Sequence, residues 1–115
     1  MQPGIDSFLP LAPATLHILL ALAGENLHGY GIMQEVTRQS EGRYSLGPGT
    51  LYDNLQRLMK QGLVEEVDHL PNDKSRRRYY RLGSLGQGVL SAEIARLEGV
   101  VKEAKMRRIP RPRRA

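Results

Sequence analysis

Residues 46–81 read LGPGTLYDNLQRLMKQGLVEEVDHLPNDKSRRRYYR, and this stretch decides the fold. Its first half predicts an amphipathic helix over residues 47–61, because Gly47 and Pro48 suit the first positions of a helix and Gly62 suits its end. Apolar side chains recur there at helical spacing and mark the face that packs. They are Leu51, Leu55, Leu58 and Met59.

The second half predicts a β-hairpin with a basic tip. Residues 63–68 and 77–82 have the composition of strands, and Pro71, Asn72 and Asp73 break the chain between them. Five cations lie within eight residues that contain no acid: Lys74, Arg76, Arg77, Arg78 and Arg81. A local patch of this kind attracts phosphate. A groove-sized helix followed by a basic hairpin is suited to reading duplex DNA.

The rest of the chain completes a winged helix-turn-helix. Helices are predicted from Ala14 to Ala23 and within HGYGIMQEVTRQS, ahead of the decisive stretch. We therefore expect a mainly α fold with a small β-hairpin (α+β), a winged helix-turn-helix followed by a C-terminal dimerisation helix. The expected divisions are an N-terminal arm (1–12), the winged helix (13–83), the C-terminal helix (84–106) and a basic, disordered tail (107–115).

Composition limits the class of protein. The chain has 115 residues, enough for one domain, and no cysteine, which excludes disulfides and cysteine-ligated zinc. Its net charge of +5 comes from the tail, where six basic residues stand without an acid: Lys105, Arg107, Arg108, Arg111, Arg113 and Arg114. No apolar run approaches the roughly 20 residues that a bilayer requires. The first residues lack a secretory n-region, so we expect a cytoplasmic protein without a membrane partner.

The C-terminal segment carries an apolar seam. Ser84 and Gln87 are spaced as a capping box, which predicts a helix that begins there. Apolar residues follow at alternating steps of four and three: Leu90, Ile94, Leu97, Val101 and Ala104. The helix could fold onto its own domain or pair with a second copy. We favour pairing, because a complete small fold already precedes the helix.

Three segments resemble the PadR-like family of winged-helix transcription regulators. They are LAPATLHILLALAGENLHGYGIMQEV, LGPGTLYDNLQRLMKQGLVEE and RRRYYRL, and the resemblance extends from residue 9 to about 104. Gly83 departs from the family pattern, which usually has threonine there, and Ser84 is expected to take over the capping. The resemblance implies a homodimer that represses transcription, with the C-terminal helix serving dimerisation. It also implies a small, mostly aromatic effector near the dimer interface, for which no ligand residues are assigned.

The candidate DNA contacts come from three segments. On the third helix, we expect Thr50, Asn54 and Arg57 to meet bases or phosphates, since asparagine pairs with adenine and arginine with guanine. Gly49 would let the backbone approach phosphate, and Tyr52 would either pack or reach a phosphate with its hydroxyl. Asp53 is expected to complement the helix dipole. The remaining candidates are Lys74, Arg76, Arg77 and Arg78 in the wing (69–78), and His28 and Tyr30 at the start of the second helix.

Other functions find less support in the residues. The histidines are isolated, no paired carboxylates or nucleophile–base pair is evident, and the LGPG turn is a poor phosphate loop, so we expect neither an enzyme nor a metal or cofactor. A winged helix that binds protein would lack the wing cations. A non-specific nucleic-acid binder acting through the basic tail stays an alternative. The preferred hypothesis is a homodimeric regulator of a pseudo-palindromic operator, with the third helix in the major groove.

Overall fold

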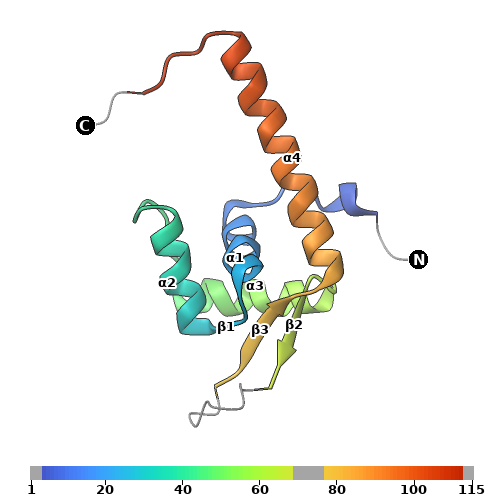
Figure 1. Cartoon of the computed structure of the whole chain (residues 1–115). Helices are drawn as coiled ribbons and strands as arrows, with labels where there is room; N and C mark the ends of the chain where they lie inside the picture. The colour runs from blue at the N-terminus through green and yellow to red at the C-terminus, as the bar shows by residue number, and fades with distance from the viewer. Residues whose placement is uncertain (1–3, 69–76, 113–115) are drawn as a thin grey trace.

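The computed structural model describes residues 4–68 and 77–112. Along the chain (Figure 1) they form η1 (Ile5–Phe8), α1 (Pro13–Gly24), β1 (Leu27–His28), α2 (Gly29–Gln39), α3 (Pro48–Lys60), β2 (Val64–Val67), β3 (Tyr79–Leu82) and α4 (Ser84–Met106). The first three α-helices and the sheet surround a common core. This arrangement confirms the expected fold class, a mainly helical winged helix with a small sheet.

The third helix begins and ends as its sequence predicts. Gly47 is the N-cap and Pro48 the first helical residue. At the other end, Gly62 adopts a positive φ of 78°, and its N–H donates to the Met59 carbonyl at 3.1 Å while the Leu63 N–H donates to the Leu58 carbonyl at 2.9 Å. Glycine closes a helix in this way at little cost. The buried leucines of α3 then join residues of α1, α2 and β2 in the core.

The sheet has a strand that the sequence did not predict. β1 pairs with β3, and β3 pairs with β2, so the described strands lie in the order β1-β3-β2. β3 is therefore the central strand. Both Tyr79 and Tyr80 of this strand are buried. His28 of β1 lies opposite Tyr79, and the two rings pack nearly perpendicular to each other.

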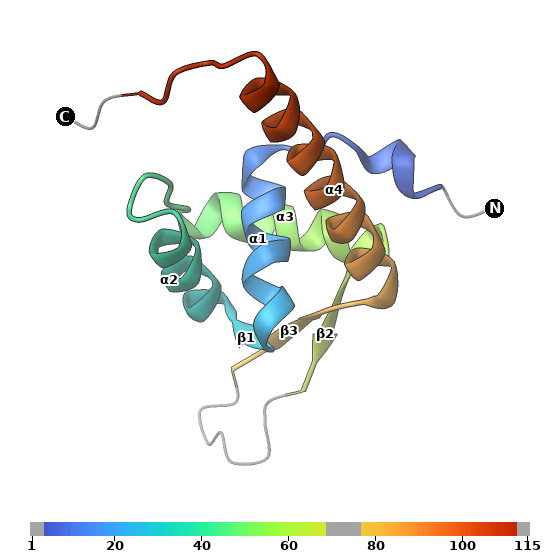
Figure 2. The same ribbon diagram turned by 45° about the horizontal axis from the view of Figure 1, so that its top comes forward.

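The last helix has two different halves. Gly83 is its N-cap and no side chain caps it, so the expected capping by Ser84 is wrong; Ser84 is the first helical residue. The first half packs on the core through Gly86, Val89, Leu90 and Glu93. The second half extends away from the other elements, as Figures 1 and 2 both show.

The N-terminal arm is held against the first half of α4. The Leu11 N–H donates to Glu93 Oε2 at 2.8 Å, and a Cβ atom at Gly88 would come within 3.0 Å of Ile5 Cδ1. Arg96 pairs with the same Glu93 carboxylate, which is 1% exposed. The arginine's hydrogen bond holds the pKa of Glu93 below its ordinary value, against the opposing effect of burial. The arm thereby ties α4 to the start of α1.

Candidate nucleic-acid interface

The outward face of α3 differs from the one expected. Residues at steps of four, three and four lie opposite the buried leucines and are exposed. They are Gly49, Asp53, Gln56 and Lys60. Sequence reasoning assigned only Gly49 of these to DNA. The signal was present in the spacing, because the stripe opposite the leucines is the one that must face outward.

Asn54 does not lie on that outward face. It is only 7% exposed, and its amide nitrogen donates to the Thr50 carbonyl at 2.8 Å. Its amide oxygen accepts from the Thr15 hydroxyl at 3.2 Å. The expectation that Asn54 contacts a base is therefore wrong in this structure, because both ends of its amide are engaged inside the protein.

Arg57 lies on the flank of α3 that faces α1. One of its nitrogens, Nη2, donates to Thr15 Oγ1 at 3.0 Å and to Asn54 Oδ1 at 2.5 Å. The side chain borders a hollow of about 240 Å³ whose other walls include Phe8 and Leu11 of the N-terminal arm. Arg57 is exposed, yet part of its guanidinium serves the contact between the two helices.

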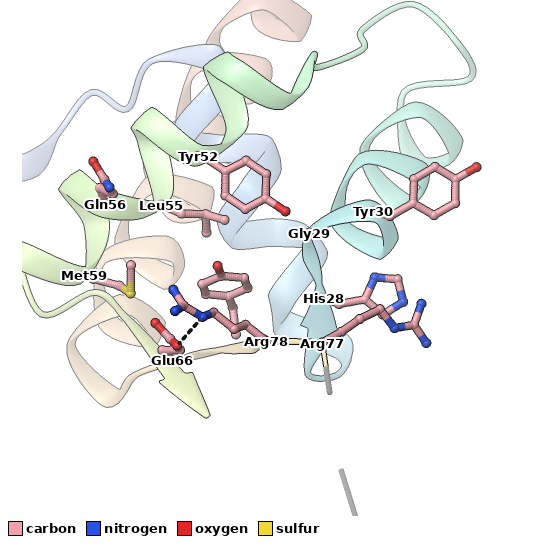
Figure 3. Close-up of a pocket in the computed structure, with 11 residues that line it drawn as sticks. His28, Gly29, Tyr30, Tyr52, Leu55, Gln56, Met59, Glu66, Arg77 and Arg78 are labelled. Atoms are coloured by element: carbon pink, nitrogen blue, oxygen red, sulfur yellow. Dashed lines mark ion pairs between the residues drawn. The ribbon is translucent and has the colours of Figure 1, made fainter. Parts of the chain in front are cut away.

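Five of the candidate residues meet at a pocket of about 350 Å³ on the other flank of α3 (Figure 3). The pocket lies between α3, the start of α2 and the strands of the wing. Tyr80 forms part of its wall, and burial raises the pKa of that phenol above its ordinary value. The candidates that line the pocket are His28, Tyr30, Tyr52, Arg77 and Arg78. Gly49, Thr50, Asn54 and Arg57 do not line it.

Tyr52 spans the gap between α3 and α2. Its ring is 45% exposed, and its hydroxyl end points toward Gly29 (Figure 3). A Cβ atom at position 29 would come within 2.3 Å of the Tyr52 hydroxyl oxygen. Glycine is thus needed at the start of α2 so that the tyrosine can lie there. Tyr52 thus packs against the start of α2 while much of the residue stays exposed, and the contact of its hydroxyl with a phosphate stays a prediction.

The two candidate residues at the start of α2, His28 and Tyr30, have different surroundings. His28 is the N-cap, and its Nδ1 accepts a hydrogen bond from the Gly31 N–H at 3.0 Å, so the ring serves the helix end. Tyr30 is 61% exposed, which excludes the alternative that it packs in the core. Its ring points away from Tyr52 in Figure 3. Of the two, Tyr30 is therefore the side chain available to an external partner.

The wing presents cations beside carboxylates. Arg81 and Glu65 are opposite each other on β3 and β2 and pair at 2.7 Å. Arg78 pairs more loosely with Glu66, at 3.4 Å between Nε and Oε1, and both side chains are exposed. Exposed pairs of this kind contribute little to stability, so Arg78 can exchange its partner at small cost. Lys74 and Arg76 lie outside the described residues.

The apolar seam of α4 is divided between the core and the surface. Leu90 is buried in its own domain, so its expected place in a dimer interface is wrong. Ile94, Leu97 and Val101 line a shallow groove further along the helix, together with Lys102 and Lys105. Ala104 is half-buried at the same end.

Within residues 4–68 and 77–112, no group of three or more His, Asp or Glu side chains could hold a metal ion. None of the helices in this part of the chain is long and apolar enough to cross a membrane.

The sequence matches the transcriptional regulator PadR-like family over residues 18–92. Transcriptional regulator Rv3488 of Mycobacterium tuberculosis (strain ATCC 25618 / H37Rv) is 34% identical over 92 residues, or 80% of this chain and 82% of that protein. A PadR family transcription regulator from Clostridium difficile R20291 superposes with a TM-score of 0.70 at 21% identity, covering 83% of this chain and 97% of the other. Bacillus subtilis PadR in complex with operator DNA superposes with a TM-score of 0.60 at 20% identity, covering 92% of this chain and 54% of the other.

Fold and surface together define a winged helix-turn-helix protein, and the two structural similarities show the same fold. The family match and the similarity to the Mycobacterium tuberculosis regulator also identify the family. The chain belongs to the PadR-like family of transcriptional regulators. The expectation that it is not an enzyme is confirmed by that membership.

Proposed function

We propose that the protein is a homodimeric DNA-binding repressor that reads a pseudo-palindromic operator with α3 in the major groove. The observation that carries this proposal is the exposed polar face of α3, which lies beside the cations of the wing and the start of α2. An α-helix fits the major groove, and side chains on its outer face reach base edges there.

The reading face would consist of Asp53, Gln56 and Lys60. Glutamine pairs with adenine, aspartate accepts from cytosine, and lysine donates to guanine. At the N-terminus of α3, no side chain caps the helix. The backbone N–H groups of Gly49 and Thr50 can therefore meet a phosphate, which the helix dipole favours.

The flank of α3 that faces the wing would follow the DNA backbone. Arg78 would exchange its loose contact with Glu66 for a phosphate, and Arg77 borders the same pocket. Tyr30 and Tyr52, which are 61% and 45% exposed, line the same pocket. Lys74 and Arg76, outside the described residues, remain part of the proposal as phosphate or minor-groove contacts. Such contacts position the protein without reading sequence.

Dimerisation would place two reading helices on one duplex. The apolar stripe of Ile94, Leu97, Val101 and Ala104 on α4, which is part exposed and part half-buried, is the proposed interface. A twofold dimer selects half-sites related by the same symmetry, about one helical turn apart. The repressor role and release by a small-molecule effector are supported by the family resemblance alone, and no effector residues are proposed.

The test begins with selection of duplexes from a random-sequence library by the full-length protein. We expect a pseudo-palindromic sequence to be recovered and bound more tightly than a scrambled duplex of equal length. Gln56→Ala should relax the preference at one position of each half-site, at a cost of about 1–3 kcal/mol. Failure to recover any preferred sequence at low ionic strength would overturn the proposal.

A second pair of variants separates backbone contacts from base contacts. Arg78→Ala should weaken selected and scrambled duplexes alike and reduce the salt slope by about one unit. Arg38→Ala is the matched control, since Arg38 is equally exposed but lies at the far end of α2, paired with Glu35. Removal of residues 107–115 tests the alternative of non-specific binding through the tail, which it should abolish while leaving operator binding largely intact.

A further inference from the structure

Three polar side chains meet where α3 contacts the first turn of α1. Thr15 of α1 is 6% exposed, and its hydroxyl lies 3.2 Å from Asn54 Oδ1 and 3.0 Å from Arg57 Nη2. The same Arg57 nitrogen donates to Asn54 Oδ1, and the Asn54 amide nitrogen donates to the Thr50 carbonyl. Every polar atom of the Thr15 and Asn54 side chains thus has a partner, and all the partners belong to α1 or α3.

We propose that Thr15, Asn54 and Arg57 are positioning residues, which set the orientation of α3 and thereby decide which of its side chains face the bases. The inference rests on the proposed function, because it concerns how the same reading face is held. It assigns Arg57 to the contact between helices, where sequence reasoning had expected a base contact.

The physical argument starts from the apolar contacts of α3. Leu51, Leu55 and Leu58 bury fully against the core, but hydrophobic burial is non-directional and tolerates small rotations of a helix. Hydrogen bonds depend steeply on angle and distance. A rotation of α3 would break the two hydrogen bonds that cross between the helices, from the Thr15 hydroxyl to Asn54 Oδ1 and from Arg57 Nη2 to the Thr15 hydroxyl. The buried Thr15 hydroxyl would then lose these partners, which costs more than the bonds themselves contribute when made. The hydrogen-bonded cluster of Thr15, Asn54 and Arg57 therefore excludes orientations of α3 that the leucines alone would allow.

The consequence concerns specificity more than affinity. Contacts with base edges need hydrogen-bond geometry, so they depend on the exact orientation of Gln56 and Asp53. Phosphate contacts from the wing and the tail are largely electrostatic and tolerate small displacements. Loss of the cluster should therefore lower binding to the preferred sequence and leave binding to other sequences nearly unchanged.

Thr15 offers a clean test because it is buried and cannot itself contact DNA. Thr15→Val removes the hydroxyl at nearly constant volume, and Thr15→Ser keeps it. The measurement is the ratio of affinities for the duplex selected by the wild type and for its scrambled counterpart. We expect Thr15→Val to lower this ratio by about tenfold, the upper range for one hydrogen bond, and Thr15→Ser to preserve it. A folded Thr15→Val protein with the wild-type ratio would overturn the inference.

Arg57→Met is the second variant in this experiment, and it does not alter the core because Arg57 is exposed. If Arg57 acts through the cluster, the double variant Thr15→Val/Arg57→Met should discriminate no worse than the poorer single variant. If the two substitutions instead lower the affinity ratio by factors that multiply in the double variant, Arg57 contacts DNA independently of Thr15 and the inference is wrong. Absence of any discrimination by the wild type would instead defeat the proposed function, so the two failures are distinguishable.

Discussion

Two glycines, Gly29 of α2 and Gly49 of α3, leave space at the proposed interface for different reasons. Gly29 leaves room for the Tyr52 hydroxyl, which a Cβ would displace. Gly49 has open space around the position of a Cβ, so nothing inside the protein requires glycine there. We propose that glycine matters there for the approach of DNA, which agrees with its place on the outward face of α3.

Gly49→Ala should separate stability from DNA binding. Alanine suits a helix better than glycine and meets no atom within 4 Å, so thermal unfolding should occur at an unchanged or higher temperature. The added methyl would hold phosphate away from the helix N-terminus, and affinity measured by fluorescence anisotropy should fall several-fold. Gly99→Ala is the matched control, because position 99 is equally open but lies on α4. Equal affinities for the two variants would contradict the role given to Gly49.

At the scale of elements, α4 is docked by close backbone contact. A Cβ on Gly86 would lie 2.1 Å from the Leu63 carbonyl oxygen and 2.8 Å from Leu82 Cδ1. Glycine here lets the helix approach the end of α3 and the wing closely. The wing, α3 and α4 are therefore held at one junction.

Gly86→Ala should disturb that junction. Overpacking against backbone costs about 1–3 kcal/mol, and chemical denaturation should show at least that loss, because the carbonyl cannot move as a side-chain tip can. Gly99→Ala, in the projecting half of the same helix, should raise stability by up to about 1 kcal/mol. A neutral Gly86→Ala would mean that α4 shifts freely on the core.

Glu93 links α4 to the arm in a pH-dependent way. Its pKa in the folded state lies below the ordinary value of 4.5, chiefly because of the hydrogen bond from Arg96. The carboxylate therefore adds stability above that ordinary pKa, and the contribution is lost as pH falls through the lower folded value.

Glu93→Gln should reduce stability at neutral pH and flatten its decline between about pH 5 and lower values. Denaturation midpoints measured across that range provide the comparison. Glu35→Gln is a matched control, since Glu35 also has an arginine three residues later and a lowered pKa but is far more exposed. Its effect at neutral pH should be small. If stability depends on pH in the same way in the two variants, the burial of Glu93 adds nothing to the stabilisation by its ion pair.

At the scale of the whole molecule, the projecting half of α4 leaves part of its apolar stripe exposed among the described residues. Val101 is 51% exposed in the groove with Ile94 and Leu97, and Ile94 is 36% exposed. Exposed apolar surface at this scale is typical of an interaction site. A second copy of the chain is the occupant we propose.

Val101→Asp should therefore dissociate the dimer, because it would bury an unpaired charge in the interface. Sedimentation velocity on the full-length protein should show a lighter species, and operator affinity should fall with it. Ala95→Asp introduces the same charge at an exposed position that is neither three nor four residues from any member of the stripe, so this variant should stay dimeric. A wild-type protein that is monomeric at micromolar concentration would refute the proposed interface.

Prediction from sequence succeeded where local chemistry decides the structure. Gly47, Pro48 and Gly62 marked the limits of α3, and the leucine spacing identified its buried face. It failed for Asn54, whose polarity suggested a surface position, because a partner from α1 satisfies it inside. It also missed β1, since a strand of two residues has no pattern of its own and exists only by pairing with β3.

The order of the α-helices and of the two wing strands, the buried stripe of α3 and membership of the PadR-like family thus followed from the sequence alone, through caps, turns and periodic apolar residues that act within a few positions. Tertiary structure alone decided that the Arg57 guanidinium hydrogen-bonds to α1 and that Leu90 belongs to the core. The reason is physical. A polar or apolar side chain has no fixed role until segments far apart in the chain bring it a partner or leave it exposed.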